Sequence, residues 1–554
     1  MYIKVISPNS NPPKNDRSDV TFYLRQDNWN DHSYQTQYHL FLSSRYTDDG
    51  EILSIGDVKI LKKGQTKADG LQLTVGEFES LSDDFCSVGQ SLDFYERLAN
   101  INSDLRHYIL SSLRDVVIFK EFKSGFEDEE GWKISLMRDI GSDDDIFLLS
   151  PIIISREYQK IPSIDLKFQF NTVGLESPIE FDFDSPAYSY KEKLPSRMIV
   201  LVGRNGSGKS TLLSKISRIA FSSGSDRKDA VLSRVGSFEP SGLGFPKVVN
   251  ISYSAFDSFQ IPGIYIHEKE QILRDLSKHQ GRYIFCGIRD ICKELEQSRE
   301  VISYDDRGRL SEADILRDRE EFTHLKSVDR LSVEVKELLE IINKNKKGEL
   351  LLGAFSILSK ESSFKAIYTS VSGGDSTADI VKIFMTLSTG HKFVIHSIVN
   401  IVAHTEKRSL ILFDEPETHL HPPLLAVLMS EIRYVLGKVD AFSIIATHSP
   451  VVVQETLSKH VHIIRRSGES TKVISPDIQT YGESIASITS FVFGLSSDIT
   501  DFHYEIDKVI NNIKLSFIKK SDKEIMNDIE KLFSGKTSVQ ARAYIMSKLI
   551  HGED

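Results

Sequence analysis

The chain has few cysteines for its length and no long apolar run. Its 554 residues include only Cys86, Cys286 and Cys292, too few for a disulfide framework and at spacings that match no zinc or redox motif. No run of about 18 apolar residues occurs, and no basic segment leads into an apolar one near Met1, so we expect neither a membrane span nor a secretory leader. These absences favour a cytoplasmic protein with no membrane contact.

A strong positive charge is also missing. The chain carries 68 Lys and Arg against 79 Asp and Glu, a formal charge of −11, which argues against a protein that coats nucleic acid with its whole surface. A local basic groove is not excluded. The composition, 40% hydrophobic and 27% charged, is that of a folded protein, and two to four domains are expected at roughly 150 residues per domain.

The most informative segment is 203–211, with the sequence GRNGSGKST. A buried-strand pattern precedes it and apolar residues follow it at helical positions, which is the context of a nucleoside-triphosphate phosphate loop. Its glycines let backbone N–H groups face the phosphates. Lys209 is expected to neutralise the β- and γ-phosphates, and Ser210 to ligate Mg²⁺. The predicted ATP-binding residues are Asn205, Gly206, Ser207, Gly208, Lys209, Ser210 and Thr211.

Two acidic residues follow a second buried-strand pattern, 410–413. Asp414 ends that strand, where a carboxylate can hold Mg²⁺, and Glu415 is the candidate base for the attacking water. A third strand pattern ends before His448, which we expect to sense the γ-phosphate through a hydrogen bond from its imidazole. The chemistry predicted from these residues is hydrolysis of ATP to ADP and phosphate.

The patterns divide the chain into five parts. We predict an N-terminal α+β accessory domain over 1–160, a first ATPase lobe with the phosphate loop over 161–260, a mainly helical insertion over 261–380, a second ATPase lobe over 381–480, and a C-terminal helical subdomain over 481–554. Ser521 with Glu524 forms a predicted capping box in the last part.

The segment 387–392, LSTGHK, resembles the signature loop of ATP-binding-cassette (ABC) ATPases, which normally reads leucine, serine, two glycines and glutamine; it departs at Thr389 and His391. In that superfamily the signature of one subunit completes the ATP site of the other. The resemblance therefore implies that Ser388 and Gly390 bind ATP across a homodimer. It also implies an α/β fold: an ABC-type P-loop ATPase head with an inserted helical region, an N-terminal α+β accessory domain and a C-terminal helical subdomain.

The glutamine that the superfamily places after the strand at 248–253 is absent. Residues 254–257 read SAFD, and the first glutamine is Gln260. The metal-sensing role of that position is therefore not assigned by the resemblance.

The segment 414–422, DEPETHLHP, resembles the soluble branch that contains SMC-like, DNA-repair and overcoming-lysogenization-defect ATPases. The phrases at 481–484, 490–494 and 283–289 look like the PtuA ATPases of Septu-type and retron-associated antiphage systems. That resemblance implies a separate HNH-type nuclease of the PtuB kind as partner, and possible association with a reverse transcriptase and its nucleic-acid product. The ATP sandwich itself implies a homodimer or a higher homo-oligomer.

Two other hypotheses remain open. In the first, the chain is an SMC-like DNA-repair or chromosome-maintenance ATPase that contacts DNA directly. Its candidate phosphate contacts are Arg289, Arg299, Arg307, Arg309, Lys344, Lys346 and Lys347, although their many acidic neighbours favour a solvated helix surface. In the second, ATP is a structural ligand of a scaffold with no meaningful turnover.

Overall fold

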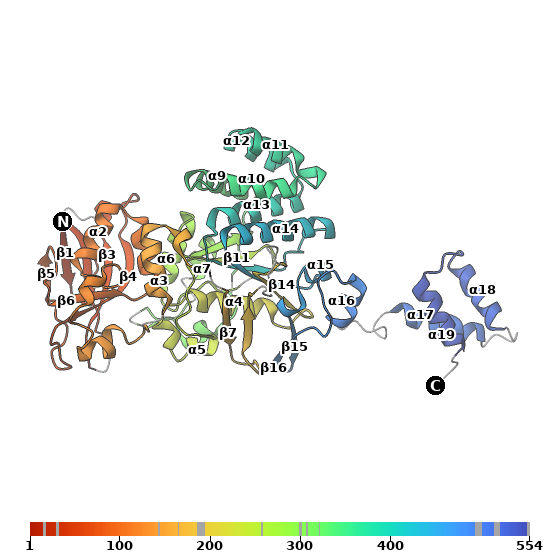
Figure 1. The fold of residues 1–554 in the computed structure, drawn as a ribbon, viewed down its shortest axis with the longest axis horizontal. Helices are drawn as coiled ribbons and strands as arrows, with labels where there is room; N and C mark the ends of the chain where they lie inside the picture. Colours follow the sequence, from red (N-terminus) through yellow and green to blue (C-terminus); the bar gives the residue numbers. More distant parts are fainter. Residues whose placement is uncertain are drawn as a thin grey trace. The chain divides into compact units, whose positions relative to one another are not determined.

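The computed structural model describes residues 1–14, 18–28, 33–141, 144–163, 165–184, 194–255, 257, 259–298, 302–305, 308–320, 322–493, 501–514 and 521–550. These residues form two compact units, Met1–Glu483 and Ser484–Asp554, which are described separately. Figure 1 labels their helices and strands.

A six-stranded sheet forms the N-terminal part of the first unit, in the order β5-β1-β2-β3-β4-β6. Its inner face and the helices that cover it share one hydrophobic core, which runs from Ile3 to Ile161. The elements are β1 (Tyr2–Ile6), β2 (Val20–Gln26), β3 (Gln37–Leu42), η1 (Ser44–Tyr46), β4 (Leu53–Lys62), β5 (Gly76–Phe78), β6 (Phe85–Gly89), α1 (Leu92–Asn100), α2 (Ser103–Ser112), η2 (Lys120–Lys123), η3 (Trp132–Leu136), α3 (Asp145–Ser155) and η4 (Tyr158–Lys160).

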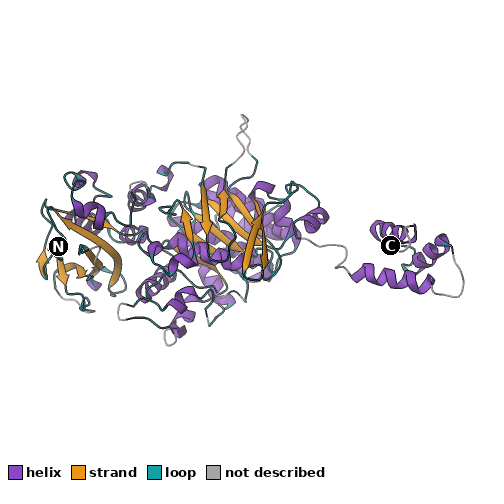
Figure 2. Ribbon diagram, turned by 90° about the horizontal axis from the view of Figure 1, so that it is seen from below, coloured by secondary structure: helices purple, strands orange, loops and turns teal. Residues whose placement is uncertain are grey.

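A seven-stranded sheet forms the centre of the same unit, in the order β12-β11-β13-β14-β9-β15-β16, and Figure 2 shows its strands side by side with helices around them. All its neighbouring strands are parallel except the last pair. The strands are β9 (Met198–Val202), β11 (Val248–Ser252), β12 (Tyr283–Gly287), β13 (Leu410–Asp414), β14 (Phe442–Thr447), β15 (Val461–Ser467) and β16 (Ser470–Ile474). Because β9, β13 and β14 are parallel and adjacent, their carboxyl ends meet at one edge.

The central strands are buried on both faces, as parallel strands between helices must be. Leu201, Leu412 and Ile444 pack in a core with α4 (Lys209–Phe221). Phe413, whose side chain points to the other face, contacts Phe393 of α13 (Thr389–His404), with ring centroids 6.3 Å apart. The alternation along β13 therefore places α4 and α13 on opposite faces of the sheet.

A small antiparallel sheet, β10-β7-β8, adjoins this core. Its strands are β7 (Lys167–Asn171), β8 (Ile179–Asp182) and β10 (Ser237–Glu239), and the nearby short elements are η5 (Asp226–Lys228), α5 (Leu232–Val235) and α8 (Glu312–Leu316). Phe168, Phe181 and Phe238 pack together between its strands and the central sheet.

Helices from the second half of the unit are stacked on the α13 face of the central sheet (Figure 1). Helix α13 contacts β11 and β12, α9 packs on α13, and α12 packs on α9. The elements are α9 (Val328–Lys344), α10 (Gly348–Leu358), η6 (Ser362–Phe364), α11 (Lys365–Gly373), α12 (Thr377–Thr386), α14 (Pro422–Val439), α15 (Pro450–Gln454) and η7 (Ser458–His460). Helix α9 has an apolar face, on which Val335, Leu338, Leu339 and Ile342 are buried.

The segment 261–380, predicted to be mainly helical, also contains a strand of the central sheet. Strand β12 pairs in parallel with β11 from Tyr283 to Gly287, between α6 (Ile266–Ser277) and α7 (Ile291–Ser298). This part of the chain is therefore partly core rather than wholly an insertion.

Buried ion pairs connect the N-terminal sheet and its helices to the central core. Lys247 pairs with Glu96 at 2.7 Å, and Arg408 pairs with Asp145 at 2.6 Å. Both pairs are almost fully shielded from solvent, so loss of one partner would leave a buried charge unpaired.

The second unit consists of short helices: α16 (Ile485–Phe491), α17 (Asp501–Lys514), α18 (Asp522–Leu532) and α19 (Val539–Ile550). Ile510, Ile529 and Ile545 are among the residues of its own small core. The capping box predicted at Ser521 and Glu524 begins α18. In the described part of the chain, no helix of either unit has the length and apolar character needed to cross a membrane. The fold class predicted from the sequence, an α/β P-loop head with added α+β and helical parts, is confirmed.

Candidate functional site

The loop between β9 and α4 forms a cradle whose shape depends on glycine. A Cβ on Gly203 would lie 2.6 Å from the carbonyl oxygen of Ile464, so no larger residue fits there without a shift. Gly206 and Gly208 have φ angles of +80° and +95°, which side chains disfavour. Helix α4 starts at Lys209, so its first unpaired N–H groups face the loop and favour an anion there.

Lys209 lies inside this loop and is 4% exposed. Its Nζ donates to the carbonyl oxygens of Gly203 at 3.0 Å and Arg204 at 3.3 Å. Burial lowers the pKa of Lys209, while the negative charges of Glu415, Asp414 and Glu417 act in the opposite direction. The lysine therefore lies within the field of all three carboxylates.

Ser210 and Asp414 are 204 residues apart in the sequence and touch in the structure. The Ser210 Oγ donates to Asp414 Oδ1 at 2.9 Å. Burial raises the pKa of Asp414 to about 8, opposed by the Ser210 hydrogen bond and reinforced by the charges of Asp257 and Glu415. The Asp414 carboxylate is buried and not fully compensated by positive charge. Together with the Ser210 hydroxyl it forms a set of oxygen donors that suits Mg²⁺. Ser207 adds a buried Oγ that has no hydrogen-bond partner within the described part of the chain.

Glu415 has a strained backbone. Its φ is +47°, a left-handed conformation that costs a non-glycine residue on the order of 1–3 kcal/mol. Its N–H donates to the carbonyl of Ala446 on β14 at 2.8 Å, which holds the residue in place. The side chain is 28% exposed and therefore accessible to water.

His448 follows β14 and lies between two carboxylates. Its Nδ1 is 3.7 Å from Glu415 Oε1 and 3.0 Å from Glu417 Oε1. The neighbouring carboxylates of Glu415 and Glu417 raise the pKa of His448 to about 10, although burial opposes them. The imidazole is therefore a cation at neutral pH, beside the proposed base.

Glu417 had no assigned role from sequence, yet it joins the ends of two strands. Its carboxylate accepts from Thr447 Oγ1 at 2.8 Å and from the His448 N–H at 2.6 Å, and it also meets the His448 ring. The side chain is only 10% exposed. Sequence offers one signal for it, its position two residues after Glu415, but its partners come from a different strand.

Asp257 is a second residue that sequence reasoning left without a role. It lies in the loop after β11 and is 4% exposed, and its charge raises the pKa of Asp414. Its Oδ1 accepts from the Phe259 N–H at 2.9 Å and pairs with Arg289 at 3.4 Å, whereas Oδ2 has no partner among the described residues. Gln260, three residues on, has a buried Oε1 for which the residues that the structure describes supply no partner. The loop after β11 therefore adds a carboxylate to this edge.

The predicted signature residues lie apart from the cradle within one chain. Ser388 is the N-cap residue of α13, and its Oγ hydrogen-bonds His391 Nδ1. A Cβ on Gly390 would lie 3.0 Å from the carbonyl oxygen of His419, so the glycine permits α13 to approach the loop after β13. Their contacts in the described residues are with this loop and with α13 rather than with 205–211.

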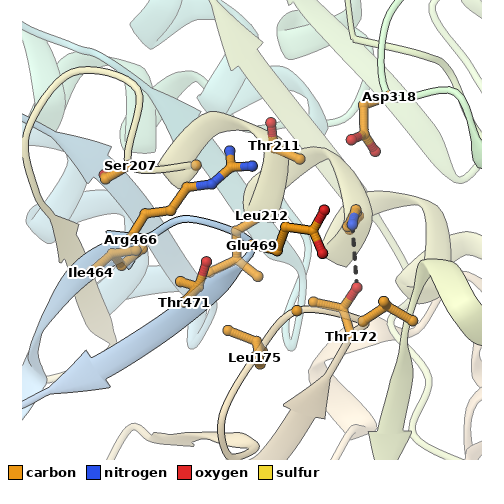
Figure 3. A pocket seen from close by; sticks show the side chains of 14 residues that line it. Thr172, Leu175, Ser207, Thr211, Leu212, Asp318, Ile464, Arg466, Glu469 and Thr471 are labelled. Carbon is orange, nitrogen blue, oxygen red and sulfur yellow. Dashed lines mark hydrogen bonds between the residues drawn. The ribbon is translucent and has the colours of Figure 1, made fainter.

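A cavity of about 170 Å³ adjoins the phosphate loop and is shown in Figure 3. It lies between Ser207 and Thr211 on one side and the β15–β16 hairpin on the other, and the loop 172–175 closes it. Arg466 and Glu469 of the hairpin extend into it, and Lys215 Nζ donates to Thr172 Oγ1 at 3.3 Å. None of the described residues that line it is aromatic.

No protein-family model matches the chain. Protein ea59 of Escherichia phage lambda is 28% identical over 551 residues, which cover 96% of this chain and 95% of that protein.

Solved structures give weaker similarity. An SMC head bound to the C-terminal winged-helix domain of ScpA is 13% identical with a TM-score of 0.26, covering 57% of this chain and 97% of that one. An ATP-binding cassette of an ABC transporter in its ADP conformation is 15% identical with a TM-score of 0.26, covering 59% and 95%. TM-scores this low mean that the structures agree with this chain to a limited extent only.

Proposed function

We propose that this chain is an ATPase that binds ATP with Mg²⁺ between two copies and uses hydrolysis as a switch. The observation that carries the proposal is the contact between Ser210 and Asp414, because it joins the phosphate loop to the carboxylate strand. Lys209, Glu415 and His448 belong to the same edge of the sheet.

Each residue has a chemical role in this proposal. The amides of 205–211 and the Lys209 ammonium hold the triphosphate, and Ser210 with Asp414 would hold Mg²⁺, which would neutralise charge on the β- and γ-phosphates. Glu415 orients the attacking water and accepts its proton as the water oxygen bonds to the γ-phosphorus and the bond to the β–γ bridging oxygen breaks. Glu417 keeps His448 oriented toward the γ-phosphate, so the imidazolium can donate to it.

The cavity beside the loop is the proposed place of the nucleoside. Because no aromatic ring lines it, the planar guanidinium of Arg466 is the group best suited to stack on the base. Ser388 and Gly390 are proposed to bind the phosphates held by a second copy, since α13 starts beside them and a helix N-terminus favours an anion.

The proposed output of the switch is control of a separate HNH-type nuclease in antiphage defence. It rests on the sequence phrases that look like PtuA. The alternative, direct action on DNA, loses three of its candidate contacts to carboxylates: Arg289 pairs with Glu294, Arg309 with Asp229 and Lys347 with Glu406. Lys344 and Lys346 remain, and Arg299 and Arg307 lie outside the described residues.

The enzymatic part is tested with purified wild type, Lys209→Ala and Glu415→Gln. We expect Lys209→Ala to lose ATP binding, and Glu415→Gln to retain it while turnover falls by about 100-fold or more. Glu349→Gln, on the exposed start of α10, is the matched control with normal turnover. A wild type that assembles on ATP without hydrolysing it would support the scaffold hypothesis instead.

The test of the proposed regulatory role requires the identity of the neighbouring genes. If an adjacent gene encodes a small nuclease, the two products should copurify, and nuclease activity should differ between the wild type and Glu415→Gln. Equal nuclease activity in every nucleotide state, or a strongly salt-dependent affinity of this chain alone for DNA, would favour direct action on DNA.

A further inference from the structure

A serine, a histidine and an aspartate form a hydrogen-bonded chain in the N-terminal sheet, away from the phosphate loop. His39 Nε2 lies 2.7 Å from Ser54 Oγ, and His39 Nδ1 lies 2.5 Å from Asp57 Oδ1. With the ring N–H on Nδ1, the imidazole donates to Asp57 and accepts from the Ser54 hydroxyl. This is the order of contacts by which a histidine activates a serine: nucleophile to base, and base to carboxylate.

A bulge between β3 and β4 is what brings the three side chains together. Residues three apart on a regular strand point to opposite faces, so Ser54 and Asp57 would not both reach His39. The register shifts here: Asp57 lies opposite His39, while Ser54 lies opposite Phe41, which shares a face with His39. One extra residue in β4 therefore turns Ser54 to the histidine, and bulges of this kind are common beside active sites.

The surroundings hold the histidine and leave an approach from solvent. The His39 ring packs against Phe41, with centroids 4.6 Å apart, and edge-on against His267 of α6 at 5.6 Å, and its side chain is 8% exposed. Asp57 is 42% exposed, and Ser54 is partly exposed. Burial would raise the pKa of Asp57, but His39, His267 and Arg25 together lower it, so Asp57 is a carboxylate at neutral pH.

We propose that Ser54 is an activated nucleophile that takes ester or other acyl substrates, with His39 as its base and Asp57 as the group that orients His39. The Ser54 oxygen bonds to the acyl carbon as its proton passes to His39 Nε2. The bond to the leaving group breaks, and His39 gives that group the proton. Water then cleaves the acyl-serine by the same route in reverse, restoring the free hydroxyl.

The test uses the full chain with a fluorophosphonate probe and with p-nitrophenyl acetate. We expect one probe per chain, found on Ser54 by peptide mass spectrometry, with fluoride released and the serine proton taken by His39. Labelling should vanish in Ser54→Ala and slow by about 100-fold or more in His39→Gln. Asp57→Asn should also slow it, because the carboxamide no longer fixes the ring orientation.

Controls separate this site from the ATPase and from simple stability. Ser103→Ala, at an exposed serine of α2, and Lys209→Ala should label like the wild type, so the outcome does not depend on the proposed ATPase. Circular dichroism checks that each variant is folded. If Ser54→Ala does not fold, Ser54→Thr takes its place. Absence of labelling in the folded wild type, or a labelling rate unchanged in His39→Gln, would overturn the proposal.

Discussion

At the scale of single residues, the carboxylate of Glu417 holds two residues, Thr447 and His448, at the edge of the central sheet. Glu417 fixes Thr447 and the backbone N–H of His448 and shares the His448 ring with Glu415. Its removal should therefore change the ionisation and the orientation of His448 together.

We predict that Glu417→Gln lowers the pKa of His448 and reduces ATP turnover while ATP binding remains. The pKa of about 10 means that His448 contributes stability below its ordinary value of 6.5, and that this contribution is lost as the pH rises through 10. Titration of the ring by NMR checks the first part, and steady-state hydrolysis checks the second.

The matched control is Glu455→Gln, because Glu455 pairs with Arg433 rather than with His448. An unchanged His448 titration in Glu417→Gln would mean that Glu415 alone sets the charge of the ring.

The sequence located the loop 203–211, Asp414, Glu415 and His448 because each follows a recognisable strand pattern. It could not assign Glu417 or Asp257. Glu417 meets Thr447 and His448 at the end of β14, and the pairing of β11 with β13 brings the loop of Asp257 to Asp414. It also did not reveal the bulge that turns Ser54 to His39, because the register shift is a property of the pairing between β3 and β4.

At the scale of elements, a buried polar chain joins β11, α13 and α9. The hydroxyl of Tyr253, just after β11, meets His396 Nδ1 at 2.5 Å, His396 Nε2 meets Glu334 Oε2 at 3.1 Å, and Lys326 meets Glu334 at 2.9 Å. These contacts fix one tautomer of the His396 ring. They also connect the loop that carries Asp257 to α13.

We predict that Glu334→Gln lowers the free energy of unfolding at pH 7 by about 3 kcal/mol. The neutral amide would no longer compensate the charge of Lys326, which is largely buried. Burial acts to raise the pKa of Glu334, but His396 and Lys326 together lower it to about 2. Its stabilisation is therefore present above the ordinary value of about 4.5 and is lost as the pH falls toward 2.

Urea denaturation between pH 7 and pH 3 measures this effect. The wild type should lose more stability than Glu334→Gln over that range, and Glu340→Gln, on the exposed side of α9, should follow the wild type. Parallel curves for all three proteins would contradict the assigned role.

Element prediction succeeded where a pattern was distinctive and failed where it was not. The capping box of α18, a serine with a glutamate three residues on, has a fixed spacing that can be read from sequence. Strand β12 cannot be read in this way, because five residues between charged helices carry no periodicity that separates a buried strand from a buried helical turn.

At the scale of the whole molecule, the contacts of Ser388 and Gly390 leave the proposed ATP site incomplete within one chain. We predict that Ser388→Arg binds ATP as a monomer but does not dimerise on ATP, because a bulky cation at the start of α13 blocks closure onto a second copy. Nucleotide titration and light scattering with the Glu415→Gln background measure the two properties.

Lys392→Ala, in the first turn of the same helix, is the comparison variant, since its Nζ donates to the carbonyl of Leu387 within its own chain at 2.7 Å. Normal ATP-driven dimerisation of Ser388→Arg would exclude a shared site.

The internal bonds of Lys209 and Ser210 have a kinetic consequence. Because the loop carbonyls and Asp414 hold these two side chains, binding of the proposed triphosphate would cost little ordering of either side chain. On binding, Lys209 and Ser210 would exchange their present hydrogen-bond partners for the phosphates and the metal ion. In the proposed cycle we therefore expect closure or release, rather than capture of the triphosphate, to be the slow step.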